Sequence, residues 1–188
     1  MKKSLYFLGL LSLLSFSALA QTEQGTWLVG LAGNGSINRV QNARNTNVLF
    51  MPHVAYFVSR NVALGGQLSV DHTRRTFDTN LISSSTATGA NALARFYIGD
   101  RKLRPYVNVM AGYAWHRAKG LDGITGEPMR FRGDQRWNTS VGAGVAYFVA
   151  PKVALEADVN YRYFWRGDFD TRKNAGTTFR LGLSLYLK

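Results

Sequence analysis

Three histidines, His53, His72 and His116, are the residues of this chain best suited to acid–base chemistry. A histidine can activate a serine hydroxyl when the two side chains lie within hydrogen-bond reach and an acid orients the ring. The alternation of the sequence turns only His72 outward, near the end of a strand, with no strand serine beside it; the serines at 83–85 are expected in a loop. We therefore predict no catalytic residues.

Metal and phosphate chemistry find little support in the composition. The chain has 188 residues and no cysteine, which excludes a zinc–thiolate site and a thiol nucleophile. Gly33-Asn34-Gly35 is a short glycine run expected at a strand end, not a phosphate-binding loop before a helix. Hydrophobic residues make up 46% of the chain, which excludes disorder. No metal and no cofactor are predicted.

The first twenty residues have the pattern of an export signal. Lys2 and Lys3 precede an apolar stretch at 5–16, and Ala18-Leu19-Ala20 is a small-x-small cleavage site. We predict a signal peptide over 1–20, cleaved before Gln21, and a single domain over 21–188. The net charge of +12 would suit a nucleic-acid or an anionic-lipid partner, and export argues against nucleic acid.

The mature residues alternate between apolar and polar with a period of two, which predicts strands. The connections between the segments are alternately short and long, which is typical of an antiparallel up-and-down barrel with tight turns at one end. We therefore predict an all-β, eight-stranded antiparallel transmembrane β-barrel. Its strands are expected at 25–35, 47–58, 62–73, 86–99, 105–117, 136–149, 153–165 and 176–188.

One face of these strands is predicted to meet lipid and the other to fill a narrow interior. The apolar face carries aromatic residues near both strand ends, as membrane barrels do, whereas the polar face is rich in glycine and alanine. A soluble lipocalin-like carrier would place these faces the other way round. Six charged residues fall on the inward face and are expected to form two ion-paired layers that plug the lumen. The lower layer, nearer the tight turns, comprises Arg95, Glu156 and Asp158, and the upper layer comprises Asp71, Arg162 and Arg180.

Two segments resemble the small eight-stranded outer-membrane barrels of the outer membrane protein A and X type, grouped as the outer membrane protein beta-barrel domain. Residues 52–58 with 62–65 are similar to the Pro-x-x-Gly-Tyr-Phe hairpin of that family, with Ala55 in place of glycine, and 144–148 repeat the pattern. The last strand has the alternating export signature but ends in Lys188 instead of an aromatic residue. The resemblance implies insertion into a Gram-negative outer membrane by periplasmic chaperones and the barrel-assembly machinery.

A ring of arginines is expected just above the lipid-facing belt. A guanidinium binds phosphate with two hydrogen bonds, so these residues could contact lipopolysaccharide; the alternative is solvated loop charge. The ring comprises Arg74, Arg75, Arg117, Arg136 and Arg166.

The sequence favours a monomeric structural or adhesive barrel with an envelope-integrity role. The alternatives are a narrow porin-like channel, a lipid A-modifying enzyme and the soluble carrier.

Overall fold

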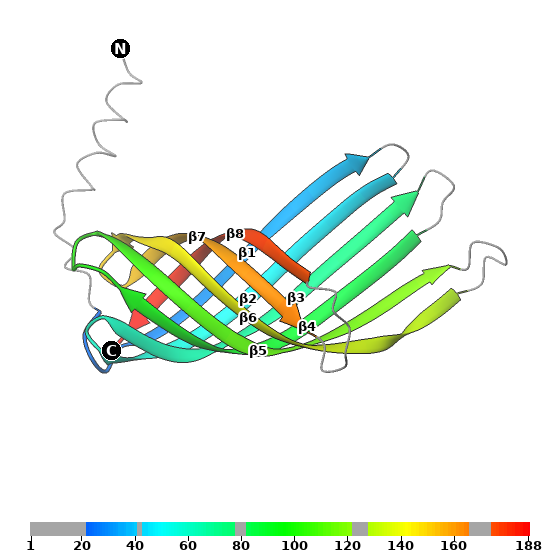
Figure 1. Ribbon diagram of the computed structural model, residues 1–188. Helices are drawn as coiled ribbons and strands as arrows, with labels where there is room; N and C mark the ends of the chain where they lie inside the picture. Colours follow the sequence, from blue (N-terminus) through cyan, green and yellow to red (C-terminus); the bar gives the residue numbers. More distant parts are fainter. Residues whose placement is uncertain (1–21, 41–42, 78–81, 122–127, 166–173) are drawn as a thin grey trace, which may run out of the picture.

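A computed structural model describes residues 22–40, 43–77, 82–121, 128–165 and 174–188. The chain forms a closed antiparallel barrel in which each strand pairs with the next, and β8 pairs with β1 (Figure 1). The strands are β1 (Trp27–Val40), β2 (Ala43–Ser59), β3 (Val62–Phe77), β4 (Ile82–Tyr97), β5 (Leu103–Leu121), β6 (Pro128–Ala150), β7 (Val153–Trp165) and β8 (Asn174–Leu187). The predicted fold class is confirmed.

Short connections gather at one end of the barrel, which also holds the C-terminus (Figure 1). Two residues, Arg60 and Asn61, join β2 to β3, and Pro151 with Lys152 join β6 to β7. The connection from β4 to β5 contains Gly99, whose φ of +73° is a left-handed conformation that glycine adopts without a steric penalty. We call this the tight-turn end.

The strands extend further toward the opposite end than the sequence predicted. Most residues of the expected long connections at 36–46, 74–85 and 118–135 lie in strands, and Ser83–Ser85 lie within β4, so their assignment to a loop was wrong. The alternation that reveals a strand arises where one face meets lipid. Beyond the lipid both faces can be polar, and the ladder continues without that signal.

The contact that closes the barrel is short. The ladder between β1 and β8 runs from the pair Trp27 and Leu187 to the pair Gly33 and Leu181. Beyond it, Asn34 replaces the backbone ladder with a side-chain bond, its Nδ2 donating to the carbonyl of Phe179 at 2.8 Å. Gly33-Asn34-Gly35 therefore lies inside β1, where this strand separates from β8, and not at a strand end as predicted.

Exposed and buried residues alternate along the strands. Leu64 and Leu68 are 46% and 58% exposed on the outer face of β3, whereas Ala63 and Gln67 are buried inside. No helix among the described residues is long and apolar enough to cross a membrane. The exposure of Leu64 and Leu68 and the burial of Ala63 and Gln67 agree with the predicted facing of the two sides.

Candidate functional site

The lumen contains an ion pair that crosses from one wall to the other. Arg95 on β4 and Glu156 on β7 belong to strands that are not neighbours in the barrel. The Nη1 atom of Arg95 donates to both carboxylate oxygens of Glu156 at 2.9 Å, and both side chains are 2% exposed. Charge-assisted hydrogen bonds of this kind are strong when solvent is excluded.

A second ion pair lies on neighbouring strands beside the first. Arg180 on β8 is paired in register with Asp158 on β7. Its Nε and Nη2 atoms donate to the two carboxylate oxygens at 2.6 and 2.8 Å, a bidentate arrangement. The hydroxyl of Tyr106 donates to the same carboxylate from β5 at 3.0 Å, so this pair is also tied across the lumen.

The remaining two residues of the expected lumen network have other partners. Asp71 accepts a hydrogen bond of 2.6 Å from the Nδ2 atom of Asn47. Arg162 approaches the sulfur of Met51 with Nη2 at 3.7 Å. The grouping into two layers also differs from expectation: Asp158, counted with the lower layer, binds Arg180 of the upper one, because the strands are staggered around the barrel.

An aromatic floor at the tight-turn end was not anticipated from the sequence. Here the hydroxyls of Tyr97 and Tyr186 lie 3.0 Å apart, and the Arg95 guanidinium lies 4.3 Å from the centre of the Tyr106 ring. Arg104, near the start of β5, is fully buried beneath this cluster and donates to Asn61 Oδ1 at 3.2 Å. The sequence contained a signal for this, because Tyr97 has the inward parity of Arg95 on β4 and Tyr186 that of Arg180 on β8. We define the floor as Leu28, Phe57, Tyr97, Tyr106, Phe148 and Tyr186.

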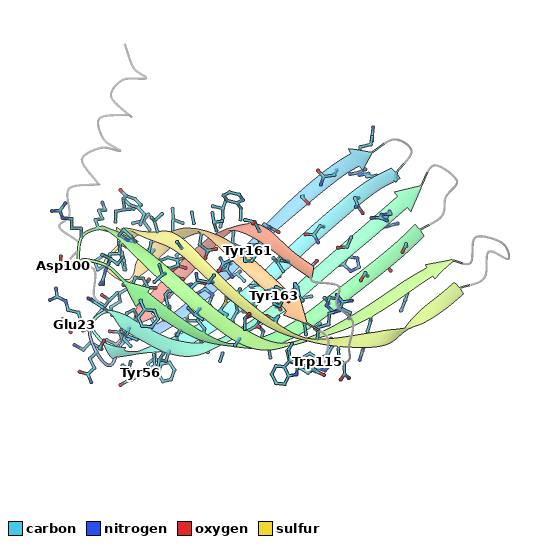
Figure 2. All side chains as sticks on the ribbon, viewed as in Figure 1. Glu23, Tyr56, Asp100, Trp115, Tyr161 and Tyr163 are labelled. Carbon is cyan, nitrogen blue, oxygen red and sulfur yellow. The ribbon has the colours of Figure 1, made fainter. Side chains whose placement is uncertain are left out.

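The outer surface carries aromatic side chains at two levels. Trp27 and Tyr56 form an edge-to-face contact with ring centres 5.1 Å apart near the tight turns. Toward the other end, Tyr113 packs against both Trp115 and Trp137, at 5.2 and 5.1 Å. Figure 2 shows Tyr56 and Trp115 at these two levels, both pointing away from the barrel. Aromatic girdles of this kind mark the two interfaces of a membrane barrel.

Each histidine has a hydroxyl or aromatic neighbour. His53 Nε2 lies 3.4 Å from Ser184 Oγ, but both residues are buried in the lumen, away from lipid. His116 contacts the ring of Phe164 at 6.3 Å between centres. His72 faces outward, as predicted, with Nδ1 3.0 Å from Thr86 Oγ1. Ser84 lines the same outer hollow as His72, so the expectation that no strand serine lies nearby was wrong.

The expected arginine ring divides between the two faces of the rim. Arg74 and Arg117 share the outward parity of Val70 and Trp115. Arg75 and Arg136 lie on the face that continues the lumen wall, and Arg75 Nε donates to Asn45 Oδ1 at 3.4 Å. The sequence placed Arg74 and Arg75 in a connection and Arg117 and Arg136 at the very ends of strands, without a facing, whereas all four lie within strands. Arg166 and the predicted signal peptide over 1–20 fall outside the described residues.

The paired lumen charges, the outer aromatic girdles and the closed barrel together define a membrane protein whose polar side is inside. A family model, the outer membrane protein beta-barrel domain, matches residues 7–186. The chain belongs to this family. It is therefore a β-barrel protein of the outer membrane, which confirms the predicted family resemblance and location.

Solved structures of other outer-membrane proteins have the same fold as this family member. The N-terminal barrel domain of Pseudomonas aeruginosa OprF is 17% identical, with 87% of this chain and 98% of that chain covered and a TM-score of 0.51. A major outer membrane protein of Thermus thermophilus is 9% identical, with 88% of this chain and 100% of that chain covered and a TM-score of 0.57.

A third structure is that of Ail, the attachment invasion locus protein of Yersinia pestis, in complex with the heparin analogue sucrose octasulfate. It is 16% identical, with 87% of this chain and 99% of that chain covered and a TM-score of 0.51. At these identities the likeness concerns the fold alone. No curated protein matches the chain in sequence.

Proposed function

We propose that this protein is a structural barrel of the cell envelope whose lumen does not conduct and which has no enzymatic activity. The observation that carries the proposal is the cross-lumen pair between Arg95 and Glu156, which joins opposite walls and is almost completely shielded from solvent. Eight strands leave an interior just wide enough for side chains. A pair that spans this interior blocks it, and the aromatic floor lies beneath it.

The geometry supports a plug more than a gate. Asp158 is held by Arg180, Tyr106 and Asn160 together, the last donating through Nδ2 at 2.6 Å. Opening the lumen would separate several of these contacts at once. The loss of even one partner from a buried ion pair costs about 3–5 kcal/mol, which keeps an open state rare.

The proposal includes contact between the outer rim and lipopolysaccharide. Arg74 and Arg117 face outward beyond Trp115, which lies in the upper aromatic girdle. Guanidinium groups at this height suit the phosphates of an anionic outer leaflet. We further propose that the protein is a monomer and that periplasmic chaperones and the barrel-assembly machinery insert it. An adhesive role for the rim is compatible with the same charges and with the attachment protein that shares the fold.

Single-channel recording in a planar bilayer tests the sealed lumen. Refolded monomeric protein is expected to leave the bilayer current at baseline, and liposomes containing it are expected to exclude small sugars and ions. Steady opening events from the monomer would refute the plug and favour the alternative, a narrow channel for small solutes.

A further inference from the structure

We propose that a hollow on the outer wall of β3, β4 and β5 binds one phosphate group of a phosphorylated glycolipid of the outer leaflet. This inference rests on the proposed contact between the rim and lipopolysaccharide, and it assigns that contact to one particular site. The hollow has a volume of about 440 Å³. We call it the β3–β5 hollow; it is lined by His72, Ser84, Thr86, Thr88, Arg117 and Lys119.

Strand register brings these side chains together. Thr86 on the central strand β4 is paired with His72 on one side and with Arg117 on the other. Ser84, two residues along β4, is paired with Lys119. Alternate residues of a strand point to the same face, so the side chains from all three strands converge on one outer surface.

The hollow begins where the lipid-facing surface ends. Its lowest residue, Thr88, is paired in register with Trp115 of the upper girdle. At and below this level the outer face of β3 is apolar and exposed, with Val70, the register partner of Thr88, 41% exposed and Leu68 58% exposed. A lipid with its acyl chains against this apolar wall would therefore place its headgroup in the hollow. This position favours a membrane lipid over a soluble ligand.

The donors in the hollow suit a phosphate group. The lining contains two cationic side chains, three hydroxyls and an imidazole, and none of its six residues is acidic. Arg117 and Lys119 are exposed, and among the described residues no carboxylate pairs with either. In the lumen, by contrast, Arg95 and Arg180 each bind a carboxylate. Within the part of the chain that the structure describes, the β3–β5 hollow thus has a positive charge without a carboxylate partner.

The hydrogen bond between His72 and Thr86 fixes the centre of the site. Nδ1 of His72 lies 3.0 Å from Thr86 Oγ1, which orients the imidazole toward the hydroxyls of the central strand, with the two cations on the other side of that strand. Arginine supplies several N–H donors in a planar fork, and lysine adds a point charge; both are common phosphate ligands. The imidazole and the hydroxyls provide further donors to the remaining phosphate oxygens.

Native mass spectrometry of the folded full chain in detergent micelles tests the site, with bisphosphorylated lipid A and its fully dephosphorylated form as probes. The double variant Arg117→Gln with Lys119→Gln is expected to bind the bisphosphorylated form at least tenfold more weakly than the parent protein. The double variant Arg75→Gln with Arg136→Gln removes the same number of rim cations from the face that continues the lumen wall; it is the matched control and is expected to change affinity by less than twofold. Heat-modifiable gel mobility verifies that each variant is folded.

The remaining outcomes separate this inference from the proposal on which it rests. Equal losses of affinity for bisphosphorylated lipid A in the test variant and in the control variant would overturn binding in the β3–β5 hollow. They would leave a diffuse contact between the rim and phosphate. Equal binding of the two lipid A forms by the parent protein would refute both. Tight binding of inorganic phosphate or of a soluble sulfated sugar, without preference for lipid A, would overturn the membrane source. Addition of bisphosphorylated lipid A is expected to change the NMR signal of His72, which is assigned with the His72→Gln variant. This change would place the lipid at the hollow.

Discussion

Neutralising Glu156 is expected to destabilise the barrel strongly, because it leaves a buried cation without its counter-charge. Both oxygens of Glu156 accept hydrogen bonds from Arg95 at 2.9 Å, and Tyr186 Oη lies 3.4 Å from Oε1. Glu156→Gln keeps the shape but offers one carbonyl oxygen and a misplaced amide donor. The side chains are 2% exposed, so solvent screening does not reduce the effect.

The expected cost is about 3–5 kcal/mol of unfolding free energy, the usual consequence of breaking a buried ion pair from one side. With a urea dependence of about 2 kcal/mol per molar, the midpoint of unfolding falls by about 2 M. Reversible urea unfolding in lipid vesicles measures this, with tryptophan fluorescence and heat-modifiable gel mobility as two readouts. Glu23→Gln, which loses only an exposed ion pair with Lys188, is the control, because it removes the same charge without leaving a buried partner unpaired.

The double variant Arg95→Met with Glu156→Leu tests whether the unpaired buried cation is the cause of the destabilisation. Replacing both members of a buried pair by apolar residues is expected to recover most of the lost stability, because no charge is left unpaired. A double variant less stable than Glu156→Gln would contradict the reasoning. So would a Glu156→Gln protein with the parent midpoint, which would mean that the lumen is hydrated enough to solvate Arg95.

Two further expectations concern backbone packing and a terminal ion pair. A Cβ atom at Gly144 would lie 2.5 Å from the Cβ atom of Asp158, so Gly144→Ala is expected to lower the urea midpoint by about 1 M, on the scale of an overpacked core; an unchanged midpoint would mean that the lumen can expand. At the tight-turn end, the Lys188 ammonium donates to Glu23 at 2.5 Å and holds the pKa of that carboxyl below its usual value of 4.5. The contact therefore stabilises the fold above that value and is lost as pH falls through the lowered pKa of the folded state. Amide protection at the end of β8, corrected for the intrinsic pH dependence of exchange, should therefore fall in acid in the parent protein but show no such fall in Glu23→Gln.

The sequence allowed the barrel and the facing of its charges to be predicted, because both depend on a period of two. Glu156 and Asp158 alternate with Leu155 and Ala157 on β7, so one parity had to be inside once lipid was assigned to the other. The partner of each buried charge was harder to predict from the sequence. Arg95 meets Glu156 from a strand three places away, and such a contact depends on barrel closure and stagger.

The floor and the rim were harder to predict for different reasons. Tyr97 and Tyr186 belong to the same residue class as the girdle aromatics, and only their parity distinguishes an inward ring from a lipid-facing one. At the rim, Ser84 and Lys119 lie in strands whose two faces are both polar, so the alternation that revealed the rest of the wall is absent. The β3–β5 hollow therefore became visible only when register joined three strands.

Thiol accessibility at two adjacent positions of β8 tests the central claim that the lumen is sealed and the other face meets lipid. The natural chain has no cysteine, so each variant carries a single thiol. Ser184 is fully buried inside the barrel, and Leu183 is 46% exposed outside. In vesicles, Ser184→Cys is expected to resist both water-soluble and lipid-soluble maleimides until the protein is unfolded, whereas Leu183→Cys reacts with the lipid-soluble reagent alone. Rapid labelling of Ser184→Cys by the water-soluble reagent would show an open aqueous lumen and contradict the account.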